Sequence, residues 1–169
     1  MKHGVLRYGL AVLVVGLLGV QVASTQSPPP ARAGSLARQL VGTWRLLSWE
    51  DRAKPEGPWT HRYGEHPFGL FIYTADGHVA IQVMRNGPPD PTAPAATGLA
   101  GPFHAYYGTF IVDEAKMIVH HLVVASDSPS QVNTDQPREF QVMGDRLILG
   151  DEKVRRRVLE RLKPKDDLK

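Results

Sequence analysis

From position 40 onward, the chain alternates apolar and polar residues in short runs, which is the two-residue period of a half-buried β-strand. Turn sequences separate several of these runs. Asp76-Gly77 and Gly144-Asp145 supply glycines for tight hairpins, and residues 113–116 form a polar connection. The expected strands are 41–49, 68–74, 78–84, 105–112, 117–125, 138–143, 146–149 and 154–162. Residues 36–40 predict one helical turn before the first strand.

Eight hairpin-linked strands at this spacing predict an all-β fold, an antiparallel up-and-down meander. Closing the meander into a barrel removes both exposed edges, so we expect an eight-stranded barrel with a short N-terminal helical turn. Two segments interrupt the rhythm: residues 50–67 hold three prolines and residues 86–102 hold five. We expect the first to be a long loop. The second is either a surface connection with a short helix near Ala95 or a flap over the barrel mouth.

The first 24 residues have the three parts of a secretory signal. Lys2 and Arg7 give the positive region, residues 10–20 give an apolar run, and residues 22–24 give small side chains for cleavage. The apolar run is too short to span a bilayer of about 30 Å, although with its flanking residues an uncleaved anchor is the alternative. We predict a signal peptide at 1–24, a flexible linker at 25–34, a barrel at 35–163 and a charged tail at 164–169. The protein is then secreted or periplasmic, with no stable membrane insertion after cleavage.

Composition narrows the function classes further. The 169 residues, 42% of them hydrophobic, suffice for one globular domain. The chain has no cysteine, which excludes a disulfide framework, a thiol nucleophile and a cysteine-based zinc site. Its 20 basic residues against 17 acidic ones become 18 against 17 once Lys2 and Arg7 are removed. This near balance argues against a nucleic-acid partner.

Gly42-Thr43-Trp44 opens the first expected strand, and Arg161 lies in the last one. Other stretches of the same pattern are 69–77, 106–110, 119–122, Arg138 and 144–147. Together they resemble the lipocalin-like domain family of bacteria and fungi. The resemblance implies an eight-stranded barrel with one open end, in which Arg161 covers the indole of Trp44 and closes the bottom. It also implies a small hydrophobic ligand as the partner.

Polar residues on the first expected hairpin are candidates for ligand binding. With an even-numbered turn, Tyr73 shares a face with His78 and Gln82, while an aliphatic face opposite them packs in the core. The mixed aromatic and polar face either lines a cavity, where it holds a ligand by stacking and hydrogen bonds, or faces solvent.

His120 and His121 are neighbours on a strand, so they point to opposite faces and cannot easily bind one metal ion. If Val112 pairs with Met117, then His120 shares a face with Tyr107. These residues then either form a hydrogen-bonded polar cluster inside the barrel, or His120 is a structural histidine whose hydrogen bonds are satisfied. No metal site is expected, because the sequence has no His-x-His or His-x-x-x-His spacing and no carboxylate placed to complete a site.

Arginines on the last strands are the remaining candidates. Arg138 is in phase with Phe140 and Val142, so it either reaches inward to bind a carboxylate or lies at the rim beside Asp135. Residues 155–157 are three arginines on an alternating strand, which most simply form a solubilising edge.

The sequence therefore predicts an exported lipocalin-like barrel that binds a small, largely apolar molecule, oriented by some of Tyr73, His78, Gln82, Tyr107, His120 and Arg138. We expect no cofactor and a binding role rather than catalysis, since no known catalytic motif is present. One alternative is a cyclase or isomerase that uses His120 or His78 as general acid/base in the same cavity. Another is a filled barrel that acts through its surface on an unidentified protein partner.

Overall fold

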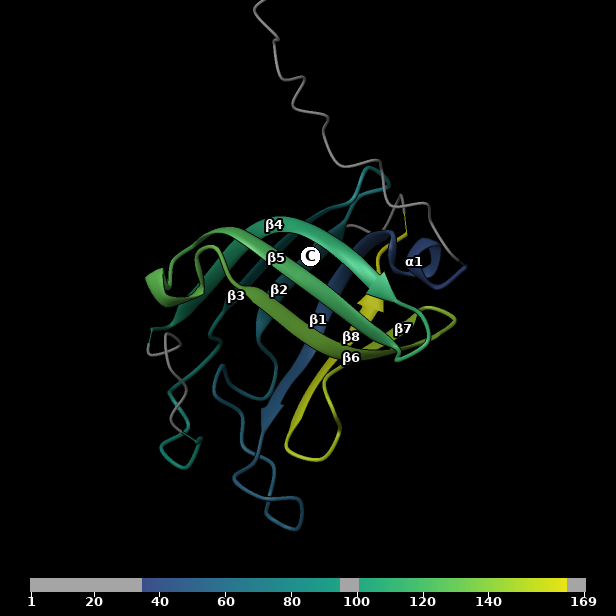
Figure 1. Cartoon of the computed structure of the whole chain (residues 1–169). Coiled ribbons are helices and arrows are strands. Elements are labelled where there is room, and N and C mark those ends of the chain that lie inside the picture. The colour runs from purple at the N-terminus through teal and green to yellow at the C-terminus, as the bar shows by residue number, and fades with distance from the viewer. Residues whose placement is uncertain (1–34, 95–100, 164–169) are drawn as a thin grey trace, which may run out of the picture.

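In the computed structural model of the chain, which describes residues 35–94 and 101–163, eight antiparallel strands form one closed barrel (Figure 1). Each strand pairs with its neighbours in sequence, and the last strand pairs with the first. The prediction of an all-β up-and-down barrel with a short N-terminal helical turn is confirmed. The elements are α1 (Ser35–Leu40), β1 (Gly42–Asp51), β2 (Phe68–Tyr73), β3 (His78–Met84), β4 (Phe103–Asp113), β5 (Ile118–Ser126), the 3₁₀ turn η1 (Pro129–Gln131), β6 (Asp135–Met143), β7 (Arg146–Leu149) and β8 (Arg155–Arg161).

Every strand begins and ends within three residues of its predicted range. Residues 50–67 are mostly loop, although Asp51 makes an isolated bridge with Thr60. The short helix expected near Ala95 lies outside the described residues, as do the predicted signal peptide, linker and charged tail. Within the described part of the chain, no helix has the length and apolarity needed to cross a membrane.

The hairpin between β2 and β3 has a different register from the one the sequence predicts. Residues 75–77 form a three-residue loop, because the Thr74 N–H donates to the His78 carbonyl oxygen at 2.9 Å. Gly77 supplies the positive φ of 89° that this loop needs. Tyr73 therefore pairs with Val79, and the even-numbered turn that we expected is wrong. An odd loop exchanges the faces of one strand relative to the other, so Tyr73 joins the buried face.

One end of the barrel is closed by a tryptophan and an arginine. Trp44 is fully buried, and its indole N–H donates to the Leu40 carbonyl oxygen at 2.8 Å. The guanidinium carbon of Arg161 lies 4.0 Å from the ring centroid of Trp44. Arg161 also donates to the carbonyl oxygens of Gln39 at 2.6 Å and Val41 at 2.7 Å. These bonds tie the end of α1 to the last strand over the apolar core.

Gly42 makes room for this arrangement. A β-carbon at position 42 would lie 2.6 Å from Nη1 of Arg161, and the backbone there has a positive φ of 139°. Any larger residue would both strain the backbone and displace the guanidinium from the Trp44 ring. The glycine of the G-x-W pattern therefore has a steric reason in this barrel.

We expect Trp44→Ala to lower the free energy of unfolding by about 3–5 kcal/mol, because it leaves a void at the closed end. Urea unfolding measures this directly. Trp59→Ala is the matched control, since Trp59 lies at the other end of the barrel beneath Arg52 and Arg156 and is only partly buried. That variant loses no more than about 2 kcal/mol. Equal losses in the two variants would contradict the role given to Trp44.

Candidate functional site

A cavity of about 380 Å³ opens at the end of the barrel opposite Trp44. Asp51, the last residue of β1, and Arg155, the first residue of β8, both line it. Trp44 and Arg161, by contrast, lie at the other ends of these two strands. The volume falls in the range of about 300–1,000 Å³ that is typical of small-molecule sites. The barrel is thus plugged at one end and hollow at the other.

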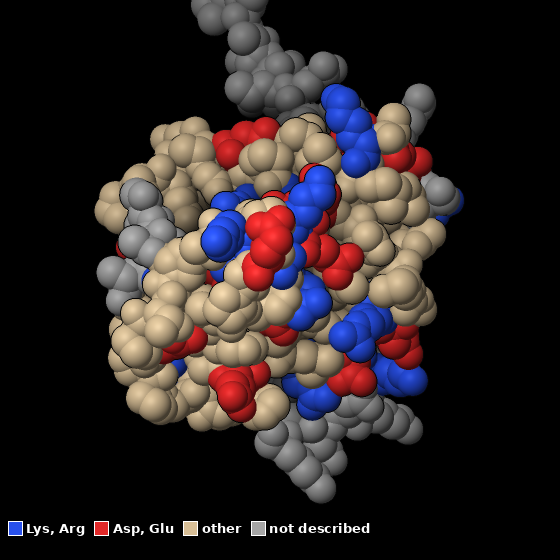
Figure 2. Space-filling model, turned by 90° about the horizontal axis from the view of Figure 1, so that it is seen from below, with Lys and Arg blue, Asp and Glu red and all other residues tan. Residues whose placement is uncertain are grey.

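Three kinds of side chain line the cavity, and the neutral polar ones are His104, Tyr106, His121, Gln131 and Gln136. An apolar and aromatic set consists of Trp49, Phe71, Ile81, Pro94, Leu149 and Val154. A charged set contains five arginines and a single carboxylate: Arg52, Arg62, Arg138, Arg155, Arg157 and Asp51. Figure 2 shows this end of the molecule, with basic and acidic side chains interleaved near its middle. The excess of guanidinium groups around an apolar wall gives the cavity a positive potential.

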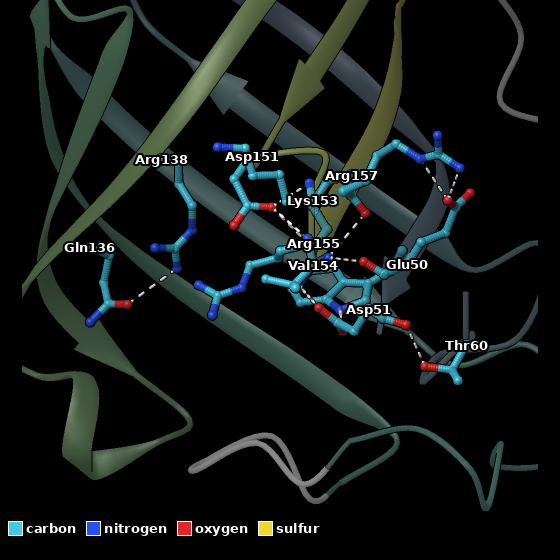
Figure 3. Close-up of polar contacts among 12 residues, drawn as sticks. Glu50, Asp51, Thr60, Gln136, Arg138, Asp151, Lys153, Val154, Arg155 and Arg157 are labelled. Carbon is cyan, nitrogen blue, oxygen red and sulfur yellow. Dashed lines mark hydrogen bonds and ion pairs between the residues drawn. The ribbon is translucent and has the colours of Figure 1, made fainter. Parts of the chain in front are cut away.

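Arg157 is a structural member of this set. Its side chain is 8% exposed, and its guanidinium carbon lies 3.8 Å from the ring centroid of Trp49. It donates to Asp51 Oδ1 at 2.9 Å and to the Glu50 carbonyl oxygen at 2.7 Å (Figure 3). Burial lowers the pKa of Arg157 to about 10, while the charge of Asp51 acts in the opposite direction. Arg157 therefore remains charged at neutral pH, and its charge is largely matched by Asp51.

Within the described part of the chain, Arg138 and Arg155 line the cavity without forming an ion pair with a carboxylate, and Arg52 likewise donates only to backbone carbonyl oxygens. The Asp151 carboxylate lies near Arg155, whose backbone N–H it accepts at 3.1 Å.

Arg138 donates to the Gln136 side-chain oxygen at 3.2 Å (Figure 3). It also donates to the Pro137 carbonyl oxygen at 2.8 Å. Asp135, the partner that the sequence offered to Arg138, binds His120 instead. Two guanidinium groups, those of Arg138 and Arg155, are thus available to a bound anion.

A buried histidine lies between two tyrosines in the interior. Nε2 of His121 is 2.9 Å from the Tyr73 hydroxyl, and Nδ1 is 2.7 Å from the Tyr106 hydroxyl. His121 and Tyr106 line the cavity, whereas Tyr73 lies in the core behind them. Burial, aided by the charges of Arg138 and His120, lowers the pKa of His121 to about 3. His121 is therefore a neutral hydrogen-bonding group at neutral pH.

A second buried histidine, His104, reaches the cavity from β4. It is 2% exposed, and its Nδ1 lies 2.8 Å from Asp127 Oδ1. Asp127 follows β5 and does not line the cavity, and its Oδ1 also accepts the Ala105 N–H at 3.0 Å. Burial lowers the pKa of His104, and the hydrogen bond that His104 donates to Asp127 opposes this shift. The ring is consequently held in one orientation by a group outside the cavity.

The structure places Tyr73 and Arg138 in the interior, and the other four predicted ligand-binding residues outside it. His78 and Gln82 are exposed, because the odd loop before β3 turns them to solvent. Tyr107 is 56% exposed and His120 pairs with Asp135 on the outer surface. The expectation that these four residues line the cavity is therefore corrected, and Tyr73 is buried in the core without lining the cavity, which leaves Arg138 as the one of the six in the lining.

Strands β4 and β5 pair two residues away from the expected register, because Val112 lies opposite Val119 rather than Met117. A shift of two residues keeps the same faces together, but these faces were assigned to the wrong sides of the barrel. Tyr107 and His120 do share a face, yet that face is the outer one, and their neighbours Tyr106 and His121 point inward. Position 121 alternates with buried Val119 and Val123, which is a usable signal. The outer positions 122 and 124 are also apolar, so the alternation alone does not show which face of β5 points into the barrel.

Three further groups were missed: His104 and Arg157, which line the cavity, and Asp127, which holds His104. His104 is in phase with Tyr106 and Phe110 on β4, and this alternation could have indicated an inward side chain. Asp127, in contrast, belongs to a turn, and only the folded barrel brings it to His104. Arg157, expected on a solubilising edge, faces the interior because β8 pairs with β1 through Trp49. Among the described residues, no group of three or more His, Cys, Asp or Glu side chains could hold a metal ion.

A closed up-and-down barrel with a plugged end and a cavity at the other end is a barrel of the lipocalin type. Comparison with protein families matches residues 41–160 to a lipocalin-like domain, well over half of the 169-residue chain. The chain belongs to this family of lipocalin-like domains. A comparison with curated proteins gives no match.

The buried histidine makes the stability of the barrel depend on pH. The pKa of His121 is about 3 in the folded chain and about 6.5 when unfolded, so the unfolded chain binds more protons between these values. The contribution of His121 to the free energy of unfolding is fully present above its unfolded pKa of about 6.5, and it is lost as the pH falls toward 3. From pH 7 to pH 5, His121 alone costs on the order of 2 kcal/mol. Urea unfolding at the two pH values measures the loss.

The variant His121→Gln isolates this contribution. Glutamine keeps a donor and an acceptor between the two tyrosines but does not titrate, so the variant loses about 2 kcal/mol less than the native chain between pH 7 and pH 5. His78→Gln, which changes an exposed histidine, is the control and behaves as the native chain does. Equal losses in the native chain and His121→Gln would contradict the burial of a neutral His121.

Proposed function

We propose that the barrel binds a small organic acid that has an apolar body and one anionic group. The observation that carries this proposal is the lining of the cavity, with five arginines against one carboxylate beside an apolar wall. The family relationship supports small-molecule binding in the barrel. The charge of the lining adds that the ligand is an acid.

Arg138 and Arg155 are the proposed partners of the anionic group. Arg138 is half-buried and Arg155 is exposed. A half-buried guanidinium gains most from a carboxylate, because planar bidentate hydrogen bonds match the two groups. Arg157 contributes less, since Asp51 already holds it. Arg138 donates to two uncharged oxygens, those of the Gln136 side chain and the Pro137 carbonyl group, and its remaining N–H donors are left for the ligand.

The apolar body of the ligand packs against Phe71, Ile81 and Leu149 deeper in the barrel. Affinity comes from apolar area removed from water, about 25 cal/mol per Å² before the costs of ordering. The ligand is therefore amphiphilic rather than purely hydrophobic, which refines the expectation drawn from the sequence. Export is part of the same proposal and is supported by the signal-like pattern of residues 1–24.

Two fluorescent probes test the anionic requirement. They are 8-anilinonaphthalene-1-sulfonate and N-phenyl-1-naphthylamine, which share an apolar skeleton and differ in the sulfonate. We expect the native chain to bind the sulfonate probe more tightly. Arg138→Gln weakens that probe about ten-fold or more, because a charge-assisted hydrogen bond is lost, and changes the neutral probe less than about two-fold.

Arg146→Gln is the matched control. Arg146 is exposed on β7 and does not line the cavity, so its removal leaves both affinities unchanged. Equal weakening of the two probes in Arg138→Gln would contradict a role for Arg138 in anion binding. Failure of both probes to bind the native chain would contradict ligand binding in the barrel.

A further inference from the structure

The hydrogen bond to Asp127 determines which nitrogen of His104 meets a ligand. A carboxylate only accepts hydrogen bonds, so Nδ1 of His104 carries the proton and donates it over 2.8 Å. Nε2 is then an unprotonated acceptor. It is the only ring nitrogen left for the cavity, because Asp127 lies outside the cavity lining. A histidine oriented by a carboxylate and open at Nε2 is the arrangement of a general base.

The other buried histidine fixes the direction of a hydroxyl group. Neutral His121 has one donor and one acceptor nitrogen, so it accepts from one tyrosine and donates to the other. Tyr73 is 1% exposed, and His121 is its only hydrogen-bond partner among the described residues. If Tyr73 accepted this bond, its own proton would be buried without a partner, at a high cost.

Tyr73 therefore donates to Nε2 of His121, and the Nδ1–H of His121 donates to the Tyr106 oxygen. The Tyr106 proton is then free for an acceptor in the cavity that Tyr106 lines. Burial raises the pKa of Tyr106 to about 12, so its hydroxyl keeps this proton at neutral pH. Tyr106 is thus a preorganised donor aimed at the ligand.

The base and the donor are neighbours. The rings of His104 and Tyr106 lie 5.5 Å apart, centroid to centroid, on the same inward face of β4. One small molecule can therefore contact both residues, with its carbonyl oxygen at the Tyr106 hydroxyl and the neighbouring carbon at Nε2 of His104. Arg138 lines the same cavity and can hold a carboxylate on that molecule.

We propose that the cavity is also a catalytic site for proton transfer at the carbon next to the carbonyl group of a small keto acid, with His104 as base and Tyr106 as donor to the carbonyl oxygen. This inference rests on the proposed function, because Arg138 must first bind the acid. It assigns the substrate class as keto acids that have an enolisable C–H bond. The His120 and His78 that the sequence offered as acid/base groups have no part in it.

The reaction is a reversible exchange of the carbon-bound proton through an enolate, and it needs no co-reactant. Nε2 of His104 takes the proton from carbon, and the electron pair of that C–H bond forms a C=C bond. The π pair of the carbonyl group moves to its oxygen, which receives the hydrogen bond from Tyr106. The protonated His104, stabilised by Asp127, exchanges its proton with solvent and returns one to the carbon.

Hydrogen exchange of phenylpyruvate in D₂O tests this inference. Loss of its C3 proton signal, followed by NMR, reports the forward step without knowledge of the natural substrate. We expect the native chain to exchange this proton faster than buffer alone, with saturation in phenylpyruvate. His104→Asn keeps a donor for Asp127 but lacks Nε2, and it lowers the exchange rate about 100-fold or more. Tyr106→Phe lowers it about 10–100-fold.

His120→Asn is the matched control. His120 pairs with Asp135 at 2.7 Å, much as His104 pairs with Asp127, but lies on the outer surface. The variant His120→Asn exchanges the phenylpyruvate proton at a rate within about two-fold of that of the native chain. Circular dichroism confirms that each variant is folded, and Tyr106→Phe, which keeps the ring, serves if His104→Asn fails to fold.

The pH profile separates a base from a structural histidine. The charged groups around His104 are Asp127, Arg138 and Arg157; Asp127 raises the pKa of His104 and the arginines lower it. The variant Asp127→Asn therefore lowers the pKa of His104, so that less of this histidine is protonated at each pH. The pH at which the exchange rate falls by half in acid moves to a lower value. An unmoved profile would contradict the role of Asp127 as a positioning residue for a catalytic His104.

Failure of this inference is distinguishable from failure of ligand binding. If the sulfonate probe binds but phenylpyruvate does not bind, or binds and exchanges no faster than in buffer, the catalytic inference is overturned and the binding proposal stands. If exchange is fast but equal in the native chain, His104→Asn and Tyr106→Phe, the assigned residues are wrong.

Discussion

Pairing of β8 with β1 closes the sheet, and the remaining features of the molecule depend on this closure. It gives each strand one face toward a dry interior and one toward water, and it brings Arg161 over Trp44 at one end. The same pairing brings Arg157 onto Trp49 and Asp51 near the other end. One strand pair therefore both seals the bottom of the barrel and builds a wall of its mouth.

Enclosure also determines the chemistry of the polar groups inside. A buried histidine that loses its water favours the neutral form, and this explains why the pKa values of His104 and His121 are both lowered. Hydrogen bonds to Asp127 and to two tyrosines hold the two rings. Arginine resists the same effect because its pKa starts so high. The interior thus keeps positive arginines beside neutral histidines and protonated tyrosines. This combination receives an anion and can donate to, or accept from, the rest of the bound molecule.

Much of this architecture follows from the sequence, and the rest depends on single-residue differences in register. The strand ranges, the hairpins, and the pairing of Trp44 with Arg161 rest on patterns that span many residues. The inward direction of Arg138 follows from its phase with Phe140. In contrast, a three-residue loop placed Tyr73 on the buried face, and apolar residues on both faces of β5 hid the choice between His120 and His121. Asp127 meets His104 only through the fold, because 23 positions and a strand pairing separate them.

Native mass spectrometry of the chain purified from its own host, beside the variant Arg138→Gln purified in the same way, tests the central claim most directly. That claim is that the barrel holds an organic acid through the arginines at its mouth. The account predicts that the native chain carries a small molecule that ionises as an acid, and that Arg138→Gln carries much less of it. A neutral molecule retained equally by both chains would contradict the account.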